Sequence, residues 1–251
     1  MTNKLPQALN SAAHAKARLD AMRPLPAHTL ASLREALALE WTYHSNAIEG
    51  NTLTLRETKV VLEGITVGGK TLREHFEAIN HRDAIVYVEE IVANKEPLDE
   101  RMIRDVHALV LKGIQPEEAG RYRQENVLIS GASTTPPHFL HLTNAMQDLV
   151  TWYSASGDMN PIIRAAELHT RFVQIHPFVD GNGRTGRLLL NLVLMQAGYP
   201  PAIIQKEERS RYYDVLDAAC LTQCYDGIAL LVAEAVQRSL DIYLQLLAPA
   251  N

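Results

Sequence analysis

The sequence predicts an all-α fold with one short β-hairpin. Apolar residues recur at helical spacing along most of the chain. Two Thr-x-x-Glu capping boxes, at Thr54 and Thr71, are typical of helix starts. The only β-type run, residues 127–129, is followed by a stretch rich in Ser, Thr, Gly and Pro, which favours a hairpin there.

The expected helices follow from local signals in chain order. Periodicity predicts helices over 9–22 and 30–48, and the two capping boxes open helices that end near Gly64 and near residue 93, before Pro97. A helix from about residue 100 should end at Gly113, where a left-handed cap is typical. The remaining helices are expected over 143–154, 161–175, 183–197, 206–221 and 226–247.

Length and composition indicate an ordinary globular protein. The chain has 251 residues, of which 47% are hydrophobic and 21% charged, enough for a sizeable core. We expect an N-terminal helical region over 1–96, a core over 97–232 and the end of a C-terminal helix over 233–251. No linker or repeat separates these parts.

Charge and hydropathy restrict the partners that we expect. A net charge of −5 argues against a nucleic-acid-binding protein, which needs a basic surface. No stretch reaches the ~18 apolar residues of a membrane span, and no secretory signal is visible. The cytoplasm is therefore the expected location.

One segment between two expected helices contains most of the chemistry. It comprises His176, Pro177, Phe178, Val179, Asp180, Gly181, Asn182, Gly183, Arg184, Thr185, Gly186 and Arg187, called the motif below. Two of its glycines, at 181 and 183, lie where a helix begins, and the unpaired N–H groups and positive dipole end of that helix favour an anion. Arg184 and Arg187 lie three apart, so that both could bind further phosphate oxygens.

The same segment provides a base and a metal ligand. His176 has an ordinary pKa suited to proton removal near neutrality. Asp180 is an oxygen ligand of the kind that Mg²⁺ prefers. A turn with a helix cap and a solvated arginine pair is the alternative, but so many reactive groups within twelve residues favour a catalytic site.

The motif resembles the Fic-family signature H-P-F-x-[DE]-G-N-G-R-x-x-R and matches it at every defined position. Members of that family transfer AMP, or less often another phosphate-containing group, to Ser, Thr or Tyr of target proteins. Residues 198–201 and 212–213 are also similar to the family, especially to the branch that includes the animal endoplasmic-reticulum enzyme. The similarity extends from about residue 45 onward, and residues 1–40 match nothing in the family.

The resemblance implies a role for each motif residue. His176 would be the general base for the target hydroxyl, Asp180 the Mg²⁺ ligand, and Asn182 the amide that holds the α-phosphate. The N–H groups of Gly181 and Gly183 would bind phosphate.

The remaining assignments also come from the family. Arg184 and Arg187 would stabilise the β- and γ-phosphates that leave, and Tyr212 would lie at the nucleotide. Phe178 is expected to be a buried anchor of the loop. Relatives often carry Asn near Cys220 to hold the adenine or ribose, and a thiol is a poorer hydrogen-bond partner, which leaves nucleotide preference open.

Two further segments resemble parts of the family. Residues 120–123 with Val127, Leu128 and Ile129 resemble its flap, a β-hairpin that could hold an extended target segment through main-chain bonds. Residues 45–51 match the inhibitory pattern [ST]-x-x-x-E-[GN], with Ser45 and Glu49 four apart on one helix face. In relatives this glutamate pairs with the second motif arginine and blocks the γ-phosphate.

These features predict an autoinhibited, Mg²⁺-dependent protein adenylyltransferase with ATP as co-substrate. The family also implies that the same site could remove AMP, with Glu49 positioning water. Relatives often dimerise, so a homodimer is possible, but the sequence does not fix the oligomeric state. A nucleotide-sensing interaction module with vestigial catalysis is the rival, against which the intact base, carboxylate and arginines argue. A helix-turn-helix reading finds no basic recognition element.

Overall fold

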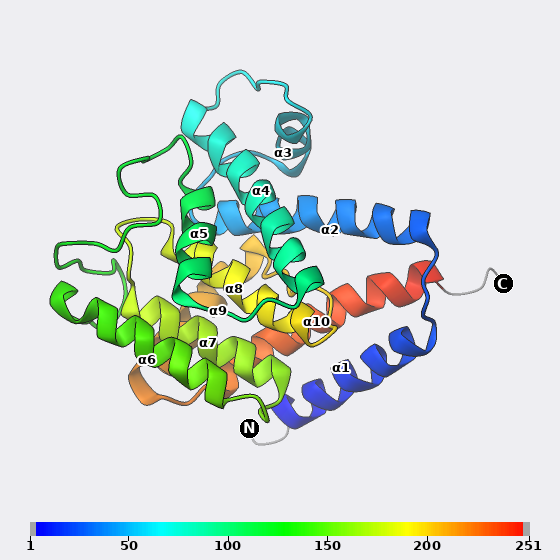
Figure 1. Cartoon of the computed structure of the whole chain (residues 1–251). Coiled ribbons are helices and arrows are strands. Elements are labelled where there is room, and N and C mark those ends of the chain that lie inside the picture. The colour runs from blue at the N-terminus through cyan, green and yellow to red at the C-terminus, as the bar shows by residue number, and fades with distance from the viewer. Residues whose placement is uncertain (1–3, 248–251) are drawn as a thin grey trace.

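The structure is a computed structural model that describes residues 4–247, and every regular element in that range is a helix (Figure 1). The α-helices are α1 (Lys4–Ala21), α2 (Ala27–Ile48), α3 (Leu55–Leu62), α4 (Leu72–Asn94), α5 (Glu100–Val110), α6 (Leu142–Ala155), α7 (Pro161–Ile175), α8 (Asn182–Gln196), α9 (Arg209–Thr222) and α10 (Asp226–Leu247), with short 3₁₀ turns at η1 (Phe139–His141) and η2 (Lys206–Glu208). The all-α prediction is confirmed.

Helix α8 is the centre of the fold. All but one of the residues from Asn182 to Leu194 are buried, so the helix has almost no solvent face. It is surrounded by α4, α5 and α7, and α1 lies along α10 at the edge (Figure 1). A helix buried on all sides is typical of the middle of a large core, and here it fixes the motif rigidly at its N-terminal end.

The local start signals are confirmed. At Thr54, the hydroxyl accepts from the backbone N–H of Glu57 while the Glu57 carboxylate accepts from the backbone N–H of Thr54. The same reciprocal pair forms at Thr71. Asn160 caps α7 and Pro161 is its first residue, as expected. Helix α5 ends at Val110, three residues before Gly113, which has φ +71°.

The predicted β-hairpin is wrong. Among residues 4–247 the structure contains no strand, and residues 127–129 form an irregular segment in which the Leu128 side chain is 84% exposed. Three β-type residues need a partner strand, and the segment that follows contains Pro136 and Pro137, which have no N–H to donate. Nearby carbonyls are also taken by a side chain, because Arg123 donates to the carbonyls of Glu125 and Pro137.

One hydrophobic core takes residues from all three predicted regions. It includes Leu37 and Trp41 of α2, Leu189 of α8 and Leu240 of α10. Helix α10 also runs without a break across the expected boundary at 232/233, so that division stays a prediction. Residues 248–251 lie outside the described range. No helix within 4–247 combines the length and hydrophobicity that crossing a bilayer requires.

Candidate functional site

The motif forms the junction between α7 and α8, as the sequence predicts. Helix α7 ends at Ile175, and His176 follows in the left-handed region with φ 49° and ψ 59°. The loop closes at Gly181, whose φ of 78° starts α8 at the next residue. A glycine is suited to that conformation, since a Cβ there would be strained.

Phe178 is the buried anchor that the sequence predicts. It is completely buried, and its ring stacks on His107 with 3.5 Å between ring centroids. His107 accepts from the Gly120 N–H at Nδ1 (2.9 Å), so its Nε2 carries the proton and donates to the Asp180 carbonyl at 2.9 Å. Burial lowers the pKa of His107 to about 4, which keeps the ring neutral.

Asn182 and Arg123 hold the loop in shape. The Asn182 amide accepts from the Phe178 N–H and donates to the Phe178 carbonyl. Arg123 binds the loop from outside, with its backbone N–H on the Pro177 carbonyl and its Nε on the His176 carbonyl, both at 2.9 Å. The resemblance predicts that Asn182 contacts the α-phosphate. In this structure the oxygen and the nitrogen of its side-chain amide both bind the loop.

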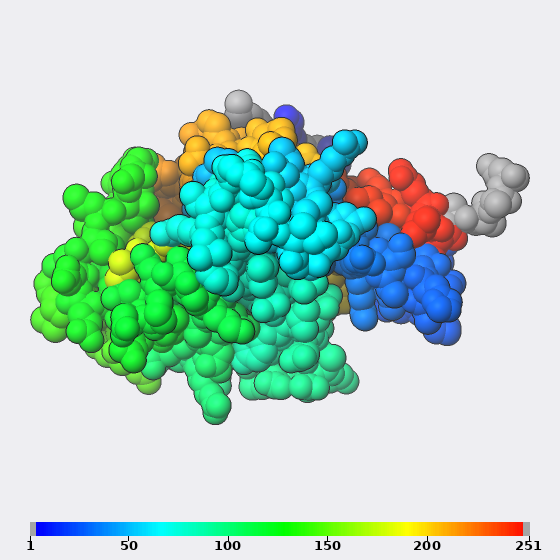
Figure 2. Space-filling view, turned by 90° about the horizontal axis from the view of Figure 1, so that it is seen from above, coloured from blue at the N-terminus to red at the C-terminus, as the bar shows by residue number. Residues whose placement is uncertain are grey.

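A cavity of about 390 Å³ lies on one side of the motif, within the range of small-molecule sites. Its lining comes from residues 45–51, the 129–134 loop, α7, α8 and α9: Glu49, Ile129, Ser130, Gly131, Ala132, Thr134, Val173, Gln174, His176, Gly183, Arg187, Arg209, Tyr212, Tyr213, Leu216, Asp217 and Cys220. The predicted base, one glycine and the second arginine therefore share one cavity. In Figure 2, yellow atoms of the motif region are visible between the green and cyan segments.

Arg187 is bound by Ser45 and Glu49 of residues 45–51, which match the inhibitory pattern and are called the inhibitory segment below. Its Nη2 donates to the Glu49 carboxylate and to the Ser45 carbonyl, each at 2.8 Å, and its Nε donates to the Ser45 hydroxyl at 3.0 Å. Its side chain is 4% exposed. Burial acts to lower the pKa of Arg187, but Glu49 and Tyr212 outweigh it and raise that pKa above its usual value. The three groups paired by the sequence pattern are thus in contact.

Glu49 also lies directly over the start of α8. A Cβ added at Gly183 would collide with the Glu49 Oε1 atom. The carboxylate therefore occupies the space beside the backbone where the sequence predicts phosphate. Only a glycine at 183 leaves room for it.

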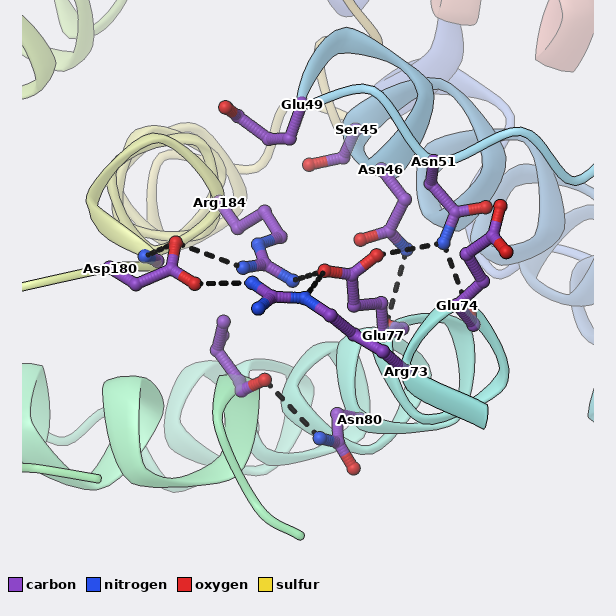
Figure 3. Close-up of polar contacts among 12 residues, drawn as sticks. Ser45, Asn46, Glu49, Asn51, Arg73, Glu74, Glu77, Asn80, Asp180 and Arg184 are labelled. Carbon is purple, nitrogen blue, oxygen red and sulfur yellow. Dashed lines mark hydrogen bonds and ion pairs between the residues drawn. The ribbon is translucent and has the colours of Figure 1, made fainter. Parts of the chain in front are cut away.

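Arg184 does not line the cavity and joins a partly exposed ionic cluster (Figure 3). Its Nη1 lies 3.2 Å from Glu77 Oε1, and its Nη2 lies 3.4 Å from Asp180 Oδ1. Arg73 joins both carboxylates from α4, with Nε 3.1 Å from Glu77 and Nη2 2.6 Å from Asp180. The two motif arginines, expected on one face, thus have different partners.

Asp180 is charged and fully engaged. Burial acts to raise its pKa, but Arg184, the Gly181 N–H and Arg73 outweigh it and lower the pKa below its usual value. Among residues 4–247 no cluster of three or more His, Cys, Asp or Glu could hold a metal ion by itself. Asp180 alone fits Mg²⁺, which commonly takes one or two carboxylates and fills its other positions with phosphate and water.

His176 is half-buried at the edge of the cavity. Burial lowers its pKa from the ordinary value of 6.5, and the positive charge of Arg123 acts in the same direction. The carboxylates of Glu49 and Asp180 offset this only in part. The imidazole is therefore neutral near pH 7, the form that a general base requires.

Tyr212 lines the cavity, and its hydroxyl is hydrogen-bonded to His169 in the core. Its hydroxyl lies 2.8 Å from His169 Nε2, its ring centroid lies 5.9 Å from the Arg187 guanidinium, and burial raises its pKa. Across the cavity rim, Ser133 donates from its N–H and its hydroxyl to Asp217 of α9, both at 2.7 Å. Cys220 also lines the cavity, and burial raises the pKa of its thiol to about 11, so it is a neutral neighbour.

The sequence did not point to three residues of the site, namely Arg73, Glu77 and His107. It placed Arg123 in the flap-like segment 120–123 but did not predict its contact with the motif. The motif partners of these residues are at least 50 positions away in the chain. The spacing of Arg73 and Glu77, four apart on one helix face, is a weak signal shared by many surface pairs. Nothing in their own neighbourhood connects them to the motif.

Comparisons with known proteins identify relatives that are similar in sequence and in fold. A sequence model of the Fic/DOC family matches residues 97–194. Protein adenylyltransferase Fic of Drosophila virilis is 40% identical over 205 residues, which cover 80% of this chain and 42% of that protein. The corresponding protein of Drosophila sechellia is 39% identical over the same share of this chain. The chain thus spans about two fifths of the length of these relatives.

Two solved structures extend the likeness to nearly the whole chain. Fic-1 (residues 134–508) from C. elegans has a TM-score of 0.88 and 31% identity, covering 96% of this chain and 72% of that one. A Fic domain containing signaling protein from Bacteroides thetaiotaomicron has a TM-score of 0.85 and 29% identity, with 94% and 96% covered. Together with the complete motif and the helical core around it, these likenesses show that the chain belongs to the Fic/DOC family.

Proposed function

We propose that this protein transfers AMP from ATP to Ser, Thr or Tyr hydroxyls of target proteins, and that Glu49 restrains the reaction. The observation that carries the proposal is the shared cavity: His176, the α8 N-terminus at Gly183, and Arg187 held by Glu49 all line it. The names of the relatives, protein adenylyltransferases, support the same reaction.

The proposed reaction begins at His176. Its neutral imidazole takes the proton of the target hydroxyl, whose oxygen attacks the α-phosphorus of ATP. The bond between that phosphorus and the bridging oxygen breaks, AMP stays on the target oxygen, and pyrophosphate leaves. The loop carbonyl of His176 is fixed by Arg123, which holds the base in place as positioning catalysis requires.

The chain would stabilise the departing charge with backbone and guanidinium donors. The N–H groups at the start of α8 and the Arg187 side chain are the available donors at the cavity. Asp180 would hold Mg²⁺, which supplies charge neutralisation to the phosphates when bound. The contact of the Asn182 amide with the α-phosphate stays a prediction from the resemblance.

The inhibitory role of Glu49 follows from competition. Arg187 Nη2 donates to Glu49 in this structure, so the same donor is not available to a γ-phosphate. We further propose that Glu49 positions water for removal of AMP from modified targets, as the resemblance implies. A homodimer and target docking along residues 127–129 also stay predictions.

A labelling experiment tests the proposal. Wild type, Glu49→Gly and His176→Ala are incubated with lysate and ATP labelled at the α-phosphate, and in parallel with ATP labelled at the γ-phosphate. Kinases of the lysate label proteins from the γ-position, so the readout is the labelling that depends on the added protein. We expect that labelling only from the α-position, most with Glu49→Gly and none with His176→Ala. Nucleotide binding without transfer in any variant would instead support the rival, an interaction module with vestigial catalysis.

A further inference from the structure

Both oxygens of the Asp180 carboxylate have donors, and two of those donors are guanidinium groups. Its Oδ1 accepts from the Gly181 N–H at 2.6 Å and lies 3.4 Å from Arg184 Nη2. Its Oδ2 accepts from Arg73 Nη2 at 2.6 Å, and Arg73 lies on α4. A metal that binds this carboxylate would therefore compete with these donors (Figure 3).

The two arginines on Asp180 differ in their freedom to move. The Arg184 side chain is 2% exposed and enclosed by the core, whereas the Arg73 side chain is 50% exposed. The Asp180 side chain is itself 33% exposed, so the contact with Arg73 lies where solvent and ions reach it. An exposed ion pair of this kind is weak and easily exchanged.

Glu77 allows Arg73 to leave without losing its charge partner. It lies one turn further along α4, and its Oε1 is 3.1 Å from Arg73 Nε. Glu77 is fixed independently, because its Oε1 also pairs with Arg184 and its Oε2 accepts from Asn51 Nδ2 at 2.9 Å. Arg73 can therefore swing from Asp180 while its Nε stays paired.

From these contacts we propose that Arg73 competes with Mg²⁺ for the Asp180 carboxylate and must release it before Mg²⁺ and the nucleotide phosphates bind. The inference rests on the proposed function, since it assumes that Asp180 is the Mg²⁺ ligand. A guanidinium N–H and a divalent cation need the same carboxylate lone pairs, so they exclude each other there. Arg73 thus sets the metal concentration at which the site fills.

The test measures metal binding rather than activity. Mn²⁺ is titrated into the protein in the presence of the α,β-methylene analogue of ATP, which cannot lose pyrophosphate. The concentration of free Mn²⁺ is measured from its EPR signal. Wild type, Arg73→Gln, Arg73→Lys and the control Arg82→Ala are compared, each also in the Glu49→Gly background. Arg82 lies on the same helix, is 43% exposed and has its ionic partner in the adjacent Asp83.

We expect the Mn²⁺ concentration at half-saturation, the midpoint, to fall about three- to tenfold in Arg73→Gln. This factor corresponds to the free energy of a charge-assisted contact that is exposed or partly shielded. Arg73→Lys keeps the charge but lacks the planar fork that spans Glu77 and Asp180, so its midpoint should also fall. Arg82→Ala should match the wild type.

Three results would overturn the inference. An unchanged midpoint in Arg73→Gln would show that Arg73 does not compete, and a higher midpoint would make it a helper of the nucleotide. A shift in Arg73→Gln with none in Arg73→Lys would assign the effect to long-range charge. If no protein in either background bound Mn²⁺ with the analogue, the proposed function itself would fail.

Discussion

Replacement of Glu49 by glycine is expected to raise AMP transfer, including self-modification, at least tenfold. Arg187 makes three hydrogen bonds to the inhibitory segment, and only the one to the Glu49 carboxylate is lost in this variant. The two to Ser45 remain and keep the guanidinium beside the cavity. The variant therefore releases a donor without displacing the arginine.

The magnitude follows from the exposure of the pair. A hydrogen bond between charged groups contributes on the order of 1.5–3 kcal/mol when shielded. The Arg187 side chain is 4% exposed but that of Glu49 is 32% exposed, so we take the lower end of the range. About 1.4 kcal/mol of relieved inhibition corresponds to a factor of ten in rate.

The assay is incorporation of α-labelled AMP at fixed ATP and protein, with circular dichroism as a check of folding. Glu49→Gln is the matched control, because it keeps the shape of the side chain but weakens the charge-assisted bond and should show a smaller gain. Arg187→Ala on top of Glu49→Gly should cancel the gain, since the γ-phosphate then loses its donor. Unchanged labelling by a folded, ATP-binding Glu49→Gly protein would refute the autoinhibition.

Three further changes test the remaining site residues. His176→Ala should reduce the rate of transfer by a factor of ~10²–10⁴ while ATP binding persists. In the protein that retains His176, the acid limb of the pH–rate profile should lie below pH 6.5, because burial lowers the pKa of His176 and the base must be neutral. Asp180→Ala should abolish metal-dependent transfer, and chelator should do the same to the wild type, so full activity in excess chelator would contradict the role of Asp180. Leu128→Pro removes a main-chain donor and should reduce labelling of protein targets but not ATP binding; equal labelling would place target docking elsewhere.

Local signals in the sequence were enough for the helices and for the centre of the site. Pro161 and the capping boxes at Thr54 and Thr71 act within one turn of chain, so the helix starts could be predicted from nearby residues. The motif is one continuous segment and was located for the same reason. The inhibitory segment was found because its short pattern occurs together with the complete motif.

The incorrect and missing parts depend on contacts between distant residues. A hairpin was predicted from residues 127–129, but a strand requires a partner, and partners are not encoded in three residues. Arg73 meets Asp180 across 107 positions, and His107 meets the Asp180 carbonyl across 73. Only the packing of α4 and α5 against α8 brings these groups together, and no local pattern predicts it.

Helix α2 carries the inhibitory segment at its end and also supplies the hydrophobic core. Leu33, Leu37, Trp41 and Ile48 are each less than 5% exposed, and Trp41 lies on the same helix face as Ser45 and Glu49. Because these side chains belong to the core, we expect removal of this helix to destabilise the fold rather than to activate the protein. We therefore expect the proposed inhibition by Glu49 to be relieved reversibly, through a few residues at the end of a helix that stays in place.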